Sequence, residues 1–418
     1  MGSSDNKTYE VEEKAERVIL VGVSLSDGFD TEKSLDELEE LATTAGAIAV
    51  GRMIQNRELV HPGTYLGKGK IEELSNLIWE TEATGIICDD ELSPAQLGNL
   101  QDMLEAKVMD RTLIILDIFA GRASTNEGKI QVELAQLKYR QSRLVGLGKS
   151  LSRLGGGIGT RGPGEKKLEM DRRLIKDRVA QLNRELKDVK RHREVAREQR
   201  SKNNVPVVAI VGYTNAGKST LLNKLTGANV YEEDQLFATL DPTTRSLQLP
   251  SKQEVLFTDT VGFIRKLPHH LIEAFKSTLE EAKYADIILH VVDSSNPQMD
   301  LQMYTVYETL RDLEVVDKPI VTAFNKQDRL ENPEVVRDLR ADKIVKISAK
   351  IGTGLEELQE VIEDILREQK IAIERIFTYG EAGKIQLIRK YGELLEEDYR
   401  EDGIFVRAYV PHEIYGKL

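Results

Sequence analysis

Residues 17–118 alternate between two hydrophobic patterns. Short runs rich in Val, Ile and Leu, typical of buried strands, are separated by stretches with apolar residues at helical spacing. We expect strands at Arg17–Ser24, Ala47–Gln55, Gly85–Asp89 and Thr112–Phe119. We expect helices at Leu35–Ala45, Lys70–Ala83 and Ser93–Leu104. This βαβ order predicts a parallel α/β domain over residues 17–120, after a flexible N-terminus at residues 1–16.

Residues 121–204 have a different pattern, which predicts two helices joined by a glycine-rich loop. The helices are expected at Glu127–Leu144 and Lys166–Arg200, with the loop at Arg153–Glu165 and a polar break at Ser201–Asn204. In the second helix, apolar residues recur every seventh position, with two more at the alternate seam position: Leu168, Ile175, Leu182, Val189 and Ala196, then Val179 and Leu186. Such a repeat with a short connection predicts an antiparallel coiled-coil hairpin.

Residues 205–370 begin with an apolar, β-branched run that leads into G-x-x-x-x-G-K-S. Strand composition at Val207–Val211 and helix composition at Ser219–Leu225 place the loop between strand and helix, as a phosphate-binding loop requires. Backbone N–H groups of such a loop converge on phosphate oxygens, Lys218 reaches the β- and γ-phosphates, and the Ser219 hydroxyl binds Mg²⁺. The expected nucleotide contacts in this segment are Gly212, Asn215, Ala216, Gly217, Lys218, Ser219 and Thr220.

Two later segments stand where nucleotide-sensing switches are expected. Within Leu236–Arg245, Thr239 is our choice for the hydroxyl that closes on Mg²⁺, with Thr243 and Thr244 as competitors. The run Asp259-Thr-Val-Gly262 offers a carboxylate for Mg²⁺ and an N–H for the γ-phosphate. The predicted metal ligands are Ser219, Thr239 and Asp259, and the predicted catalytic groups are Lys218, Thr239 and Gly262.

A strand at Ile320–Phe324 ends in Asn325-Lys326-Gln-Asp328, which specifies the base. The Asp328 carboxylate accepts hydrogen bonds from guanine N1–H and N2, which adenine cannot donate. A second run, Ser348-Ala349-Lys350, is expected to give a backbone N–H to guanine O6. The predicted ligand is therefore GTP or GDP with Mg²⁺.

Phe263 and Asn215 bear on the rate of hydrolysis. A phenyl ring follows Gly262 where Ras-like enzymes place the glutamine that orients water. We therefore expect slow intrinsic hydrolysis that a partner stimulates, with the missing group supplied by the partner's surface or by another residue. Asn215, the fourth loop position, is consistent either with a K⁺ ion beside the phosphates or with turn geometry alone. These two interpretations are equally supported by the sequence.

Composition and charge narrow the setting. The chain of 418 residues has one cysteine, Cys88, which suits a reducing cytosol, and the first residues carry no apolar secretory segment. No apolar stretch approaches the roughly 18–20 residues that span a bilayer. The net charge is −12, yet Lys138–Lys202 holds 20 Lys and Arg against 8 Asp and Glu. This basic segment fits either an RNA-facing surface or a solvated helix with internal ion pairs.

Several motifs, most of them outside the nucleotide domain, resemble the HflX family of translational GTPases. They are Asp110-Arg111, Ile118-Phe119, Arg122–Leu137, Gly155–Glu165, Tyr65–Lys70 and Leu236–Pro242, so the resemblance covers residues 17–370. It implies binding to the 50S ribosomal subunit, contact with 23S rRNA, and GTP-dependent splitting of stalled or idle 70S ribosomes under stress. The family directs its middle-domain loop to rRNA, which implies contacts by Arg153, Arg161, Lys166 and Lys167.

The chain is thus predicted to be a multidomain α/β protein. It would comprise the N-terminal parallel α/β domain, the coiled-coil hairpin, a P-loop GTPase domain with a mixed sheet at 205–370, and a small C-terminal α/β domain at 371–418. In the last domain we expect a helix at Gly380–Tyr391 and a strand at Gly403–Val410. We expect a cytoplasmic monomer and leave peripheral membrane association open. A large-subunit assembly GTPase and a nucleotide-switched protein regulator remain alternatives.

Overall fold

The computed structural model describes residues 15–25, 30–152, 163–202, 205–227, 236–237, 240, 242–267, 271, 281–330 and 337–418. The chain divides into two compact units. The first comprises Met1–Gly121 with Ala135–Val179, and the second comprises Arg122–Leu134 with Ala180–Leu418. Most of the N-terminal segment expected to be flexible, residues 1–14, lies outside the described residues.

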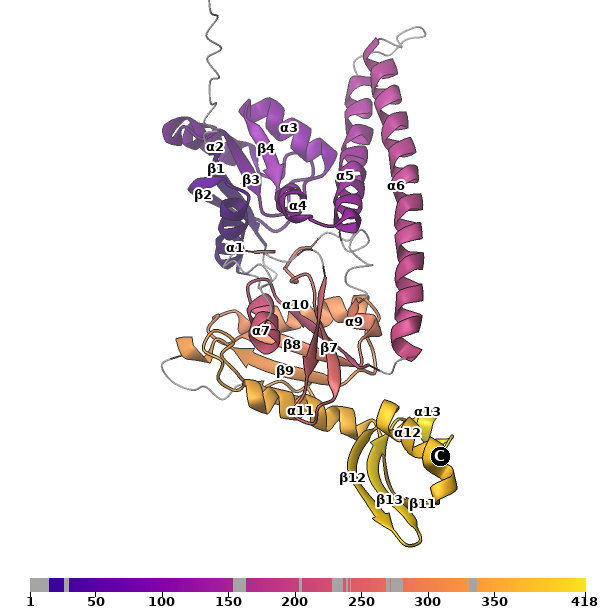
Figure 1. Ribbon diagram of the computed structural model, residues 1–418. Coiled ribbons are helices and arrows are strands. Elements are labelled where there is room, and N and C mark those ends of the chain that lie inside the picture. The colour runs from indigo at the N-terminus through magenta and orange to yellow at the C-terminus, as the bar shows by residue number, and fades with distance from the viewer. Residues whose placement is uncertain are drawn as a thin grey trace, which may run out of the picture. The chain divides into compact units, whose positions relative to one another are not determined.

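The first unit contains the expected parallel sheet, in the order β2-β1-β3-β4. Its strands are β1 (Arg17–Ser24), β2 (Ile48–Asn56), β3 (Gly85–Cys88) and β4 (Lys107–Asp110). Three helices connect the strands: α1 (Thr31–Thr44), α2 (Lys68–Thr81) and α3 (Pro94–Leu104). Helix α3 begins at Ser93 with a capping box completed by Gln96. The βαβ order read from the sequence is confirmed (Figure 1).

The strand expected at Thr112–Phe119 is wrong. This segment is helix α4 (Arg111–Arg122), and the strand that pairs with β3 is β4, immediately before it. The Asp110 carboxylate accepts a hydrogen bond from Leu113 N at 2.9 Å, which satisfies a donor in the first turn of the helix. Ile114, Ile115 and Leu116 are all buried. Within Thr112–Phe119 only Asp117 is exposed, so the nearly continuous apolar run shows no clear helical period and resembled a buried strand.

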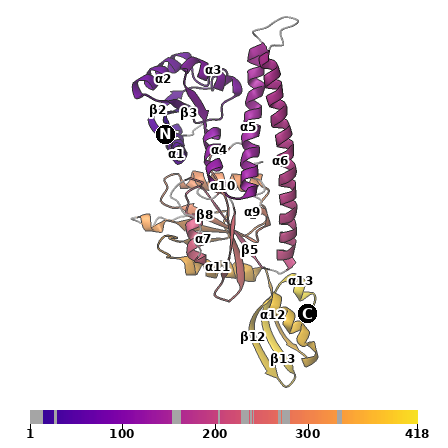
Figure 2. The ribbon, with the colours of Figure 1, turned by 45° about the horizontal axis from the view of Figure 1, so that its top comes forward.

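Helices α5 (Asn126–Ser152) and α6 (Pro163–Lys202) lie side by side and antiparallel (Figures 1 and 2). On α6 the seam residues Leu182 and Leu186 are buried, whereas Leu174, off the seam, is 61% exposed. The Arg172 guanidinium donates to the carbonyl oxygen of Leu144 at 2.6 Å, which ties the two helices together. The predicted hairpin is therefore confirmed, while most of its glycine-rich loop lies outside the described residues.

The nucleotide domain in the second unit is built on a sheet of order β10-β9-β8-β5-β7-β6, in which only β6 runs antiparallel to its neighbour. The strands are β5 (Val207–Gly212), β6 (Thr243–Gln248), β7 (Glu254–Asp259), β8 (Ile287–Asp293), β9 (Ile320–Asn325) and β10 (Lys343–Lys346). The described helices are α7 (Lys218–Thr226), α9 (Glu281–Tyr284), α10 (Met299–Asp312) and α11 (Leu355–Glu368). Leucines of α7 and α11 share one apolar core with β5 and β8, which fixes α7 against the sheet.

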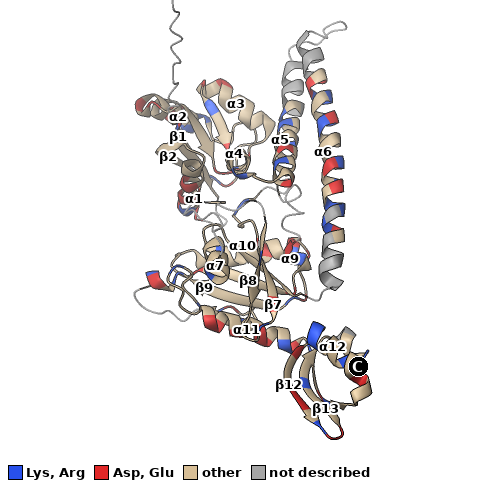
Figure 3. Cartoon of the chain, in the orientation of Figure 1, with Lys and Arg blue, Asp and Glu red and all other residues tan. Residues whose placement is uncertain are grey.

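Residues after α11 form a small antiparallel sheet of order β11-β13-β12. The elements are β11 (Ile371–Phe377), β12 (Glu393–Arg400), β13 (Gly403–Val410), α12 (Ala382–Tyr391) and α13 (His412–Tyr415). The expected helix and strand are present, but β11 and β12 were not predicted. Figure 3 shows acidic residues along β12, which is mostly exposed and therefore lacks the buried apolar alternation that predicts a strand. In the part of the chain that the structure describes, no helix has the length and apolarity to cross a membrane.

Candidate nucleotide site

The loop between β5 and α7 approaches the end of β9 closely. Gly217, at the start of α7, has φ 94°, and a Cβ there would lie 2.4 Å from Nδ2 of Asn325. Only glycine combines this left-handed conformation with that approach. Asn215, the fourth loop position, also has a positive φ of 60°, which asparagine tolerates. The loop thus combines two left-handed residues with the N-terminus of α7, the kind of backbone arrangement in which an anion cradle forms.

Lys218 is a buried cation at the centre of this loop. Its ammonium donates to the carbonyl oxygens of Tyr213 at 2.8 Å and Gly212 at 3.3 Å. Burial lowers the pKa of Lys218 to about 8, while the Asp259 carboxylate opposes this shift and the Lys326 ammonium adds to it. An anion bound over the loop would stabilise this lysine, because it would compensate for the hydration that the ammonium loses on burial.

Two predicted metal ligands lie together at the end of β7. The Ser219 hydroxyl donates to Oδ2 of Asp259 at 2.7 Å, and Asp259 is fully buried. A serine hydroxyl and a carboxylate next to a phosphate cradle are oxygen donors of the kind that Mg²⁺ prefers. These residues fit the ion that the loop sequence implies.

The segment after Asp259 pairs directly with the phosphate loop. Thr214 N donates to the carbonyl oxygen of Phe263 at 2.8 Å, and Phe263 N donates to Gly212 O at 3.1 Å. A Cβ on Gly262 would lie 2.9 Å from Cα of Thr214 and 3.0 Å from Nζ of Lys218, so a side chain there would meet the phosphate lysine. The Phe263 ring itself is buried. The residue in the place of a water-orienting glutamine therefore packs inward.

The predicted guanine motif is tied to the phosphate loop through Asn325. Its amide Nδ2 donates to Ala216 O at 2.8 Å, and its Oδ1 accepts from Ala349 N at 2.9 Å. The Ser348 hydroxyl donates to the exposed Asp328 carboxylate, and this hydrogen bond is the main cause of the lowered pKa of Asp328. Asn325 thus connects three predicted nucleotide-binding segments by hydrogen bonds: its own motif, the phosphate loop and the segment that contains Ala349.

The remaining predicted site residues have these positions. Thr220 is half-buried on α7, Lys326 is half-buried after β9, and Lys350 is exposed beside Ala349. Thr239, Arg153 and Arg161 lie outside the described residues. Lys166 and Lys167 lie on α6, and their side chains are likewise outside what the structure describes.

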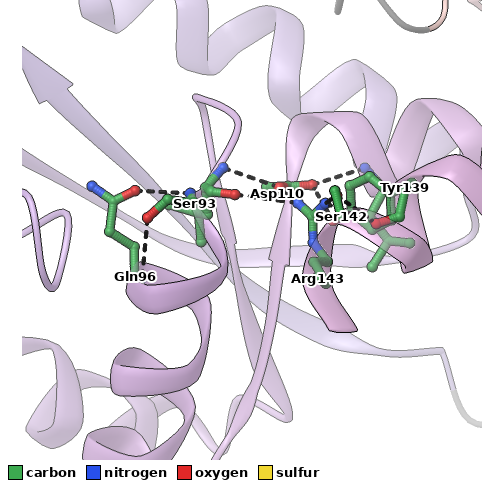
Figure 4. Close-up of polar contacts among 8 residues, drawn as sticks. Ser93, Gln96, Asp110, Tyr139, Ser142 and Arg143 are labelled. Carbon is green, nitrogen blue, oxygen red and sulfur yellow. Dashed lines mark hydrogen bonds and ion pairs between the residues drawn. The ribbon is translucent and has the colours of Figure 1, made fainter. Parts of the chain in front are cut away.

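A second polar cluster, in the first unit, was missed by the sequence analysis. The Asp110 carboxylate accepts hydrogen bonds from Tyr139 Oη at 2.7 Å, Arg143 at 2.6 Å and Leu92 N at 3.1 Å, in addition to Leu113 N (Figure 4). The guanidinium carbon of Arg143 lies 3.2 Å from the centroid of the Tyr139 ring. This cluster anchors α5 to the carboxyl edge of the N-terminal sheet. The motif containing Asp110 was recognised, but nothing in its local sequence indicates partners on α5.

Fold and site together define a P-loop GTPase, with the glycine loop, buried lysine, carboxylate and Asn-Lys-x-Asp motif on one edge of the sheet. Models of three protein families match consecutive parts of the chain. They are described as GTP-binding GTPase N-terminal at residues 32–120, GTP-binding GTPase Middle Region at 122–200, and 50S ribosome-binding GTPase at 207–326.

Full-length relatives match as well. "GTPase HflX" of Lacrimispora saccharolytica is 70% identical over 98% of this chain and 97% of its own length. "GTPase HflX" of Caldanaerobacter subterraneus subsp. tengcongensis is 51% identical over 96% and 93% of the two chains. The chain belongs to the HflX family of GTPases. Among solved structures, the crystal structure of the SsGBP and GDP complex aligns at 27% identity with a TM-score of 0.47, over 84% of this chain and 98% of that chain.

Proposed function

We propose that this GTPase binds the 50S ribosomal subunit in its GTP-bound form and splits stalled or idle 70S ribosomes. The observation that carries the proposal is the family match over nearly the whole chain, together with the ribosome-binding description of the model that matches residues 207–326. The proposal divides the chain into working parts at the boundaries expected above: residues 17–120, 121–204, 205–370 and 371–418.

The basic hairpin is the part that we assign to 23S rRNA. Its excess of Lys and Arg over residues 138–202 contrasts with the net acidity of the whole chain. Such a local excess favours binding to a polyanion, since neutralised phosphates release counterions. We place the contacts at Arg153, Arg161, Lys166 and Lys167, because a glycine-rich backbone between basic residues can approach RNA closely.

For the nucleotide, we assign the phosphates to residues 212–220 and guanine to Asn325, Asp328 and the segment Ser348–Lys350. Mg²⁺ would be held by Ser219, Asp259 and Thr239, and when bound it neutralises charge on the phosphate oxygens. The hydrogen bond between Ser219 and Asp259 supports the first two ligands. Whether Asn215 holds K⁺ is decided by comparing hydrolysis in K⁺ and Na⁺: equal rates reject the ion.

Hydrolysis is proposed to be slow until the ribosome supplies or orders the missing group. The inward packing of Phe263 supports this, because a buried phenyl ring cannot orient a water molecule. Lys218 and the N–H of Gly262 would stabilise charge on the γ-phosphate, with Thr239 closing over it.

Light scattering of purified 70S ribosomes tests the proposal. With a non-hydrolysable GTP analogue the protein is expected to lower the scattering signal, and with GDP to leave it unchanged. A variant with Arg161, Lys166 and Lys167 changed to Glu should lose this effect. Its matched control changes Arg184, Lys187 and Arg191 to Glu, since all three are exposed on the same helix.

Three outcomes separate the alternatives. A flat scattering trace from protein with confirmed analogue binding contradicts splitting. Co-sedimentation with 50S subunits but no splitting favours the assembly GTPase. If the charge-reversed variant keeps both 70S splitting and 50S binding, the hairpin loop does not contact RNA. That result favours a regulator of another protein.

A further inference from the structure

A second set of polar contacts lies at the end of β8, the strand that pairs with β9 and therefore ends beside the guanine motif. Asp293, the last residue of β8, pairs in register with Asn325 of β9 and is 9% exposed. Its Oδ2 lies 2.8 Å from Nζ of Lys326. Its Oδ1 accepts hydrogen bonds from the backbone N of Ser295 at 3.0 Å and from the Ser295 hydroxyl at 2.6 Å. One carboxylate oxygen is therefore fixed by its own turn, and the other is free to orient the lysine.

The backbone of Lys326 is also held by the neighbouring turn. Its φ of 62° is left-handed, a conformation that non-glycine residues rarely adopt. The turn after β8 holds the turn after β9 at further points: Ser294 N donates to Asn325 O at 3.0 Å, and the Gln327 side chain donates to the Ser294 hydroxyl at 2.9 Å. The shape of the guanine motif is thus set partly by residues 293–295, which lie in a different turn.

Lys326 also lies close to the phosphate loop. It follows Asn325, whose amide donates to the carbonyl oxygen of Ala216, two residues before Lys218, so the two lysines lie in contacting segments. Two ammonium groups at one site repel, and a carboxylate on one of them reduces that repulsion. The side-chain exposures of 14% for Lys326 and 12% for Asp293 leave little water to do the same.

We propose that Asp293 is a positioning residue of the nucleotide site: it holds Lys326 in place for the bound nucleotide and thereby sets the affinity for GDP and GTP. The inference rests on the proposed assignment of Lys326 to the nucleotide. Asp293 acts through Lys326, and Asp328 recognises the edge of guanine. Loss of Asp293 therefore lowers the affinity for every purine nucleotide by the same factor.

The first test is Asp293→Asn in the full-length protein, because asparagine keeps the Oδ1 acceptor for Ser295 and loses only the charge. The Kd for a fluorescent GDP analogue is expected to rise about 10- to 100-fold, the usual range for one charged hydrogen bond. The kcat at saturating GTP should stay within about twofold, since Lys326 does not touch the reacting phosphate. Asp300→Asn, the same charge change at an exposed residue of α10, should leave Kd unchanged.

A double-mutant cycle with Lys326→Met separates positioning from a general structural role. If Asp293 acts through Lys326, adding Asp293→Asn to Lys326→Met gives no further loss of GDP affinity. Additive losses, or a Lys326→Met protein that binds GDP normally, overturn the inference. The ratio of GDP to IDP affinity, which reports on the guanine 2-amino group, should not change in Asp293→Asn; a fall in this ratio assigns Asp293 to the Asp328 edge instead.

Ser295→Ala keeps the inference testable if Asp293→Asn unfolds. It removes one hydrogen bond that fixes the carboxylate, and a rise in Kd of about threefold to tenfold is expected. An unchanged Kd in Ser295→Ala, with Asp293→Asn unfolded, counts against positioning. These binding measurements need no ribosome. A failure of 70S splitting therefore leaves them intact, and their failure leaves the splitting result intact.

Discussion

Lys218 in the nucleotide domain and Arg111 in the N-terminal unit are both buried cations, but their partners differ. Arg111 forms ion pairs with Asp89 and Glu37, each at 2.6 Å, and these carboxylates raise its pKa although burial acts in the opposite direction. Lys218 meets two backbone carbonyls among the residues that the structure describes, and its pKa is lowered. Arg111 has two counter-charges at hydrogen-bond distance, whereas the Asp259 carboxylate only partly offsets the burial of Lys218, the residue that we propose as a phosphate contact.

This difference separates scaffold from site. Unpaired burial of a charge costs stability, so a protein retains it where a ligand compensates. Asp110 resembles Arg111 in this respect, because Arg143 and Tyr139 of the same chain donate hydrogen bonds to its buried carboxylate. A buried charged group is therefore a candidate functional residue when the chain does not fully neutralise it, however many hydrogen bonds it makes.

The largest expected effect comes from Lys218→Met. Removal of the phosphate-facing ammonium should weaken GDP binding on the order of a hundredfold to a thousandfold. The nucleotide-free protein should keep or gain thermal stability, because methionine fills a similar volume without a buried charge. Fluorescent GDP titration and thermal unfolding without nucleotide check both halves. A large fall in nucleotide-free stability would place Lys218 with the scaffold cations.

Arg111→Met should show the reverse pattern. The change leaves Asp89 and Glu37 without their shared cation, and breaking a buried ion pair costs about 3–5 kcal/mol in free energy of unfolding. The Kd for GDP should not change. Arg52→Met is the matched control, because Arg52 pairs with Asp36 and Glu39 at a more exposed surface, where ion pairs contribute about 1 kcal/mol or less. Equal losses in the two variants, measured by urea unfolding, would contradict the comparison.

The sequence revealed the nucleotide domain better than it revealed the scaffold, for a physical reason. The phosphate loop and its flanking strand and helix lie in one short segment of the chain. Its glycines, lysine and serine stand at a fixed spacing, which can be recognised without knowledge of tertiary contacts. Strand β5 and helix α7 were predicted to within one residue at each end. Asp328 and Ser348 belong to separate motifs, and their order along the chain was enough to expect them at one site.

The scaffold depends on contacts that no local pattern records. Arg111 and Asp89 are 22 residues apart, and Asp110 and Arg143 are 33 apart. Thr112–Phe119 was assigned to a strand because all of its residues but Asp117 are apolar or buried, which leaves no clear amphipathic spacing. Strand β12 escaped prediction because its Glu-rich sequence has weak β-propensity and pairs only through β13. In both cases tertiary packing decided the structure.

The smallest expected effect is on pH dependence, and it tests the lowered pKa of Lys218 directly. In the folded, nucleotide-free protein this pKa is about 8, against an ordinary value of 10.5. Between these values the unfolded chain holds a proton that the folded chain has released. The stability of the nucleotide-free protein therefore rises with pH across this window and is constant below it.

Nucleotide affinity should change in the opposite direction. Bound phosphates favour the ammonium form, so above about pH 8 binding must take up a proton, and the Kd for GDP should rise about eightfold from about pH 7.5 to about pH 9. Stopping at that upper limit keeps ionisation of guanine itself small. The Lys218→Met protein should show a flat profile over the same range. A flat profile in the unmodified protein would mean that Lys218 has an ordinary pKa, and the contrast with Arg111 would then rest on geometry alone.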